Sequence, residues 1–127
     1  MAKPDVKGIM RLIKAFGYSL KGFKAAWQNE EAFRTEVIVL PFMCVTAFYV
    51  GKDLTQIAIL LACLFLVLIA ELVNSSIETI VDRIGDEIHP LSGRAKDMGS
   101  SIVLVSLIIN GIVWGLLVYQ NFFNASL

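Results

Sequence analysis

The stretch IAILLACLFLVLIAELVNSSIETIVDRI, residues 57–84, runs from an apolar half directly into a polar one. Its first half, residues 57–70, contains no charged side chain, and the uncharged region extends back to Leu54. A bilayer core is crossed by roughly 20 largely apolar helical residues. The stretch therefore predicts a transmembrane helix over residues 54–84 that continues beyond the membrane, with Gly85 as its C-terminal glycine.

Composition places the whole chain in the membrane class. The 127 residues suffice for one domain, 1–127, but 57% of them are hydrophobic and the mean hydropathy is +0.71. The alternative is a compact soluble all-α bundle. A domain of this size buries only part of its surface, so it has no room to hide so much apolar side chain.

Two further apolar segments complete a set of three predicted spans. The sequence from Met98 to the end carries no charge, and VIVLPFMCVTAFYV, residues 37–50, is also uncharged. The second of these reaches spanning length only by including neighbours such as Glu36 or Gly51. We expect transmembrane helices over 30–50, 54–84 and 96–120, with a loop over 85–95 that is rich in turn-forming residues.

The N-terminal region, residues 1–28, predicts an amphipathic helix. Six apolar residues recur at spacings of three and four, whereas the lysines and Arg11 fall mainly on the other side: Ile9, Ile13, Phe16, Leu20, Phe23 and Trp27. This pattern is typical of a helix lying in the membrane interface, although packing against the protein itself would produce it too. Gly17 and Gly22 allow a break between two shorter helices. The expected fold class is all-α integral membrane.

The basic residues predict the orientation. Ten of the eleven lysines and arginines lie before the first span or between the second and third, and only Lys52 lies in the short turn between the first two. The positive-inside rule then places the N-terminus and the acidic segment in the cytoplasm. No signal peptide is visible in the first residues.

Polar residues in the second half of the opening stretch share one helical face. Glu71, Asn74, Glu78 and Asp82 project within a narrow arc at 100° per residue. Glu71 and Glu78 lie about 10 Å apart along the axis. Carboxylates at a membrane boundary require a cationic partner or an aqueous cavity. Three partners fit this spacing: basic side chains of the same protein, a divalent ion such as Mg²⁺, or a proton relay.

Several other chemistries are disfavoured. His89 is the single histidine, so a His-based zinc site is not expected, and no glycine-rich phosphate-binding motif occurs. Cys44 and Cys63 lie inside apolar spans as small hydrophobic residues. In the third span, Asn110 stands beside a Gly-x-x-x-Gly pair and is placed to hydrogen-bond across a helix interface.

With these residues identified, the chain resembles the bacterial integral-membrane diacylglycerol kinase family. The resemblance is carried by KAFGYSLKGFKAAWQNEEAFRTE (14–36), by ELVNSSIETIVDRIGDEIHPLSGRAKDMGSS (71–101) and by three spans in matching order. It implies ATP-dependent phosphorylation of diacylglycerol to phosphatidic acid at the bacterial inner membrane. It also implies a homotrimer with active sites between subunits, a fold unrelated to other kinases, and no nucleic-acid partner.

The resemblance also assigns roles to residues. Glu71 matches the general base, Glu30 and Glu78 match the Mg²⁺ ligands, and Asn74 and Asp82 support the site. Positions that match nucleotide contacts are Arg11, Tyr18, Glu30, Glu78, Glu87, His89, Lys96 and Asp97. Positions on the lipid-binding side are Arg11, Ala15, Ser19, Arg34, Glu71 and Ser100.

Other functions compete with this one. Undecaprenol kinase belongs to the same superfamily and shares the carboxylate pattern. A small proton- or cation-conducting membrane protein would use the acidic face without ATP turnover, and a structural scaffold would not need Glu71 at all. Mg²⁺-dependent, lipid-stimulated ATP turnover separates the kinases from the last two.

Overall fold

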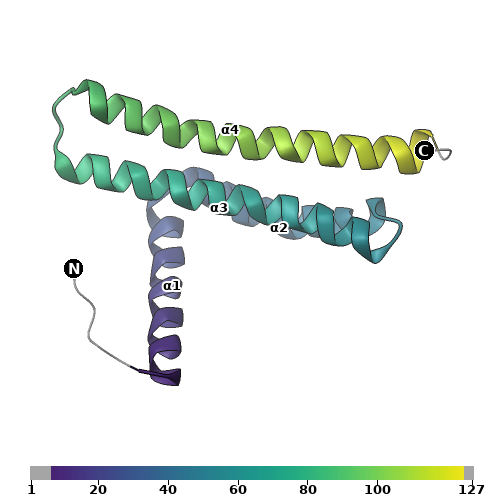
Figure 1. The fold of residues 1–127 in the computed structure, drawn as a ribbon, viewed down its shortest axis with the longest axis horizontal. Helices are drawn as coiled ribbons and strands as arrows, with labels where there is room; N and C mark the ends of the chain where they lie inside the picture. The colour runs from purple at the N-terminus through teal and green to yellow at the C-terminus, as the bar shows by residue number, and fades with distance from the viewer. Residues whose placement is uncertain (1–6, 125–127) are drawn as a thin grey trace.

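The computed structural model describes residues 7–124, which are helical along almost their whole length. The elements follow the order α1 (Ile9–Asn29), α2 (Glu31–Val50), α3 (Leu54–Ile84) and α4 (Pro90–Val118), which continues into a π-helical turn, η1 (Tyr119–Phe123). α2, α3 and α4 lie side by side lengthwise, and α1 stands crosswise to them (Figure 1). The first six residues of the predicted surface helix lie outside the described part.

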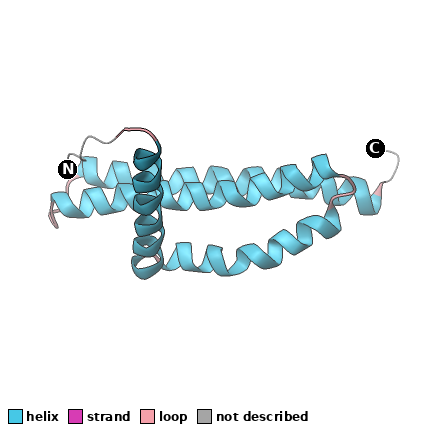
Figure 2. Ribbon diagram, turned by 90° about the horizontal axis from the view of Figure 1, so that it is seen from below, coloured by secondary structure: helices cyan, strands magenta, loops and turns pink. Residues whose placement is uncertain are grey.

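Three helices are long and apolar enough to cross a membrane. They are Glu31–Val50, Leu54–Ile84 and the continuous helical run Pro90–Phe123. The predicted fold class is therefore confirmed, and the predicted bounds 54–84 coincide with α3. Pro41 lies inside α2, and this helix is visibly bowed in Figure 2. A proline removes one backbone hydrogen bond and commonly bends a helix.

α3 is the central helix of the chain. It packs against α4 along most of its length and against α2 on another side. Ala47, Val50 and Leu60 are almost fully buried and form a small core where the three helices meet, against Trp114 and its neighbours on α4. Asn110 donates to the Cys63 carbonyl oxygen on α3 at 2.8 Å, which is the hydrogen bond across helices that its position predicts.

α1 meets the other helices at a fixed corner. The Arg34 Nη1 atom donates to the Trp27 carbonyl oxygen at 2.8 Å, and the rings of Phe23 and Phe33 stack with centroids 6.4 Å apart. α1 is continuous, so no break occurs at Gly17 or Gly22. These contacts hold α1 across the end of the helices that span the membrane.

The crosswise position explains the pattern of α1. Its six apolar stripe residues, from Ile9 to Trp27, are between 43% and 76% exposed within the chain. A helix perpendicular to transmembrane helices is parallel to the membrane plane, where such a stripe contacts lipid. The geometry thus favours the interfacial role of α1 over packing against its own chain.

The opposite end of the structure is closed by a polar turn. Asp53 caps α3 by accepting from the Gln56 backbone N–H at 2.8 Å. The Gln56 Oε1 atom accepts from the Lys52 backbone N–H at 2.9 Å and from Asn121 Nδ2 at 2.8 Å. Asn121 also donates to the Val50 carbonyl oxygen at 2.7 Å. The turn between α2 and α3 is therefore tied to η1, which follows α4.

The start of α4 differs from the prediction. The sequence indicates a loop over 85–95 and a helix from about Lys96, whereas α4 begins at Pro90 and the connection covers only 85–89. The His89 Nδ1 atom accepts from the Leu91 backbone N–H at 3.1 Å and caps the helix. Proline is well suited to the first helical position because its fixed φ matches the helix there. Pro90 thus starts a helix rather than extending the loop.

Candidate functional site

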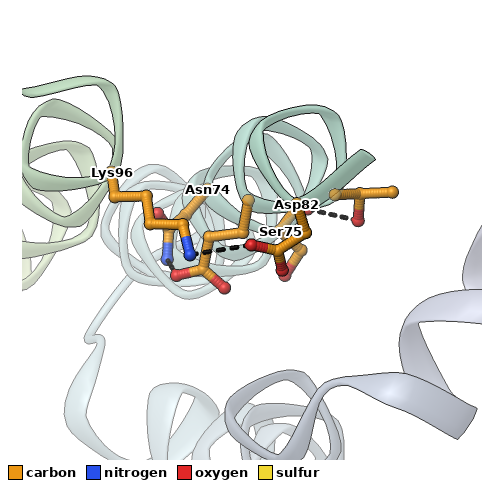
Figure 3. A network of polar contacts seen from close by, with 6 residues as sticks. Asn74, Ser75, Asp82 and Lys96 are labelled. Atoms are coloured by element: carbon orange, nitrogen blue, oxygen red, sulfur yellow. Dashed lines mark hydrogen bonds and ion pairs between the residues drawn. The ribbon is translucent and has the colours of Figure 1, made fainter. Parts of the chain in front are cut away.

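The predicted polar face lies on the continuous helix α3, beyond its apolar half. Glu71, Asn74 and Glu78 are half-buried, and Asp82, one turn further, is exposed. The Asn74 Nδ2 atom donates to Glu78 Oε1 at 3.4 Å, so two members of the face are in contact (Figure 3). Uninterrupted helix at this point places all four side chains toward the same side of α3.

The other half of the Asn74 amide faces α4. Its Oδ1 atom is buried and has no hydrogen-bond partner. A Cβ atom added at Gly99 would lie 2.5 Å from this oxygen. A larger residue at this position would force the Asn74 amide to shift, so glycine allows the α4 backbone to come this close. Gly99 thus leaves room for the Asn74 amide, whose other end donates to the Glu78 carboxylate.

One basic side chain reaches the acidic face from α4. The Lys96 Nζ atom lies 2.8 Å from Asp82 Oδ1, and this is the one ion pair of the described residues (Figure 3). Both side chains remain in contact with solvent, at 44% and 67% exposure. Exposed pairs contribute little stability, with about 0–1 kcal/mol as the usual range. The pair therefore arranges charge at this site more than it stabilises the fold.

Carboxylates surround Glu71. The charges of Glu36, Glu78 and Glu30, in decreasing order, act on the Glu71 side chain. Glu36 lies on α2 and was not predicted as a site residue, since the sequence marks it only as an acid near the start of a span. Its proximity to Glu71 results from the packing of α2 on α3. An unpaired acid within a membrane span is the signal that identifies such a residue.

A groove of about 960 Å³ runs between α1 and α3, and the acids that line it are Glu30 and Asp82. Polar residues from both helices and from their junction line it, including Ser19, Glu30, Ser75, Thr79 and Asp82. A second groove, of about 390 Å³, lies between α3 and α4 and is lined mainly by apolar side chains. Only the first groove combines room for a polar ligand with charged groups.

The acidic residues fit a hard divalent cation better than a soft one. Carboxylate oxygens are the ligands that Mg²⁺ prefers, and Mg²⁺ usually keeps several waters and binds only one or two protein carboxylates. Within residues 7–124, no group of three or more His, Cys, Asp or Glu side chains is close enough to hold a metal. Two carboxylates would suffice for Mg²⁺ that shares its coordination with water and phosphate oxygens, and the assignment of Glu30 and Glu78 to this role stays a prediction.

The structure brings only part of the predicted site together within one chain. The half of α1 that carries Arg11 and Ala15 runs away from the other helices (Figure 1). The Lys21 Nζ atom lies over the Tyr18 ring, 5.8 Å from its centroid, in a cation–π contact. The Arg34 side chain donates to a backbone carbonyl at the end of α1. The remaining predicted residues lie in the 85–89 connection or on the first turns of α4: Glu87, His89, Asp97 and Ser100. Their roles stay predictions.

Fold and site together define an integral membrane protein with a cluster of acidic side chains beyond the apolar half of its central helix. Residues 17–118 match the family model of prokaryotic diacylglycerol kinase. The diacylglycerol kinase of Escherichia coli K12 is 48% identical over 118 residues, which cover 93% of this chain and 97% of that protein. Those of Haemophilus influenzae Rd and Helicobacter pylori J99 are each 46% identical, covering 85% and 95% of this chain and 92% and 94% of theirs.

The chain belongs to the prokaryotic diacylglycerol kinase family. The resemblance identified from the sequence is therefore confirmed, and so is the assignment as a kinase. The relatives support neither undecaprenol kinase nor a conducting protein, because all those cited carry the name diacylglycerol kinase.

Proposed function

We propose that this protein transfers the γ-phosphoryl group of ATP to the primary hydroxyl of diacylglycerol and releases phosphatidic acid. The observation that carries the proposal is the position of Glu71. It lies where the apolar half of α3 ends, among other carboxylates. The groove beside α1 opens at the same end of the helices. A lipid alcohol in the membrane and a nucleotide in water meet at that depth.

Glu71 acts as the general base. Among the acids on the polar face of α3 it is nearest the apolar half, so it is placed to meet a hydroxyl at the membrane surface. It accepts the proton of the lipid hydroxyl as the oxygen attacks the γ-phosphorus. A positioned base contributes roughly 10²–10⁴-fold in rate. The apolar stripe of α1 lies in the interface beside it and orients the lipid there.

Glu78 and Glu30 hold Mg²⁺ on the nucleotide side. Phosphoryl transfer depends mainly on positioning and on neutralising charge, which Mg²⁺ supplies when bound to the phosphates. Asn74 fixes the Glu78 carboxylate through its amide hydrogen bond. Lys96 supplies a further positive charge at the mouth of the site. Arg11, Tyr18, Glu87, His89 and Asp97 complete the proposed nucleotide contacts.

The complete site is composite, and the protein works as a homotrimer in the bacterial inner membrane. The half of α1 that carries Arg11 and Ala15 lies away from the other helices of its own chain (Figure 1), which supports a contribution to the site of a neighbouring subunit. Most side chains of the α4 span are exposed in the single chain and are available to other subunits or lipid. The basic residues gather at the acidic end, which supports a cytoplasmic active site.

The test is transfer of labelled γ-phosphate from ATP in mixed micelles with Mg²⁺. Wild type and Glu71→Gln are assayed with diacylglycerol and, separately, with undecaprenol. Phosphatidic acid formed by wild type and lost in the variant is the expected result. Product from undecaprenol alone would retain the mechanism and change the substrate. No product from either lipid, in folded protein, would overturn the proposal.

A further inference from the structure

The register between α3 and α4 determines which carboxylate Lys96 lies beside. Two contacts fix this register: Gly99 lies against Asn74, and Asn110 donates to the Cys63 carbonyl. The two helices are antiparallel, so a residue three positions before Gly99 on α4 lies opposite a residue three positions after Asn74 on α3. The Lys96 backbone therefore lies level with residue 77, next to Glu78.

Lys96 nevertheless pairs with a different acid. Its ammonium group reaches one helical turn further along α3 and lies 2.8 Å from Asp82. The charge of Glu78 also attracts Lys96, but these two side chains form no ion pair in the described part of the chain. Glu78 instead accepts from the Asn74 amide. Two acids, four residues apart on one face, thus compete for one cation, and Asp82 holds it.

We propose that Asp82 is a positioning residue that holds Lys96 beyond Glu78 and so keeps the Glu78 carboxylate open to a divalent cation. The inference rests on the proposed function, in which Glu78 is a metal ligand. Without Asp82, the nearest acid to Lys96 is Glu78, one turn back. A lysine paired there occupies the carboxylate, and the divalent cation must displace it before binding.

The magnitude follows from the exposure of the pair. Solvent-exposed ion pairs are weak, so displacing Lys96 from Glu78 weakens cation affinity by about threefold rather than abolishing it. The effect is specific to the combination of residues. Cation affinity falls only when Lys96 is present and Asp82 is absent. If loss of the Asp82 negative charge alone weakened cation binding, the presence of Lys96 would make no difference.

The experiment measures Mn²⁺ binding to the full-length protein in mixed micelles, from the EPR signal of free Mn²⁺, without ATP or lipid substrate. Salt at about 0.15 M screens long-range charge effects. The set comprises wild type, Asp82→Asn, Lys96→Gln, the double variant and Glu78→Gln. Asp86→Asn is the matched control, since Asp86 is an acid of the same end and belongs to no ion pair of the described residues.

Asp82→Asn is expected to raise the Kd for Mn²⁺ about threefold, the range that an exposed pair allows. Adding Lys96→Gln restores it, whereas Lys96→Gln alone and Asp86→Asn leave it unchanged. The inference is overturned if Lys96→Gln changes the Kd by the same factor in the wild type and in the Asp82→Asn variant. It is also overturned if Asp82→Asn leaves the Kd unchanged while Glu78→Gln raises it. If Glu78→Gln also leaves the Kd unchanged, the metal assignment of the proposed function fails, and the inference fails with it.

Discussion

The two ends of the transmembrane helices use polar residues in opposite ways. At the turn between α2 and α3, the side chains of Asp53, Gln56 and Asn121 hydrogen-bond to backbone groups and to one another. At the acidic end, the charges of three other carboxylates act on Glu71, and the Asn74 Oδ1 atom is buried without a partner. At the far turn the polar groups satisfy one another and hold structure, whereas the acidic end gathers like charges.

This contrast predicts that the two ends separate activity from stability. Neutralising a carboxylate at the acidic end reduces catalysis and leaves the fold intact, whereas removing a hydrogen-bonding side chain at the far turn lowers stability and leaves catalysis intact. The energetic reason is that like charges near one another oppose folding, so removing one of them releases repulsion. Hydrogen bonds between well-paired groups at the far turn favour folding instead.

The largest effect is expected for Glu71→Gln. Loss of the base reduces kcat by about 10²–10⁴-fold. The midpoint of unfolding in SDS should not fall, since the neutral amide removes repulsion from Glu36, Glu78 and Glu30. Phosphatidic acid formation and SDS unfolding, measured on the same preparation, check both parts. A variant that loses stability along with activity would mean that Glu71 serves the fold, and the contrast between the two ends would break.

Gly99→Ala is expected to have the next largest effect. The added Cβ would lie 2.5 Å from Asn74 Oδ1, so the amide and the Glu78 carboxylate behind it must move. Small misplacements of catalytic groups are costly, and we expect kcat to fall about tenfold. Overpacking should also lower the free energy of unfolding by about 1–3 kcal/mol.

Gly111→Ala is the matched control for this substitution. Nothing lies within 4 Å of a Cβ added at Gly111, on the same helix. The control should therefore lose neither activity nor stability. Equal losses in both variants would show that alanine is harmful anywhere on α4, and the role of Gly99 beside Asn74 would be withdrawn.

How far the sequence predicts this molecule differs between its parts. Helical periodicity places Glu71, Asn74, Glu78 and Asp82 on one face, because spacing along a single helix requires no knowledge of its neighbours. The bounds of α3 were predicted from local signals too, the uncharged run that begins at Leu54 and the glycine, Gly85, that follows the helix. What lies opposite that face was not predicted. Contacts of Gly99 and Glu36 with the face depend on how separate helices pack.

The predicted start of α4 was wrong for a different reason. Pro90 is both a loop signal and a good first helical residue, and the sequence alone does not decide between them. The capping residue, His89, is not among the usual N-cap types, so its presence in the sequence did not predict the start of a helix. The ambiguity is resolved by the hydrogen bond from the Leu91 backbone N–H to His89.

Asn121→Ala tests the far turn. It removes hydrogen bonds to the Val50 carbonyl and to Gln56, and we expect the free energy of unfolding to fall by about 1–2 kcal/mol. Activity should stay at the wild-type level, since the turn precedes α3, whereas Glu71 lies beyond the apolar half of that helix. SDS unfolding and the transfer assay measure the two quantities. A loss of kcat without a loss of stability would show that the far turn serves catalysis rather than the fold.

Asn110→Ala has the smallest expected effect and tests the region between the two ends. Its amide donates to the Cys63 carbonyl at 2.8 Å and to the Ser106 carbonyl at 2.9 Å, inside the apolar part of α3 and α4. A hydrogen bond in so apolar a place would be expected to be strong. Measured values inside membrane proteins nevertheless average about 0.6 kcal/mol, because side chains also find partners when helices separate within the lipid.

We therefore expect Asn110→Ala to lower the free energy of unfolding in SDS by about 0.6 kcal/mol and to leave kcat unchanged. The loss should be smaller than that of Asn121→Ala, although both residues join two segments through backbone carbonyls. Asn121 lies at the end of the span, where its groups exchange partners with water on unfolding, and Asn110 does not. A loss for Asn110 equal to or above that for Asn121 would mean that membrane depth, rather than the partners available after unfolding, determines the strength of these bonds.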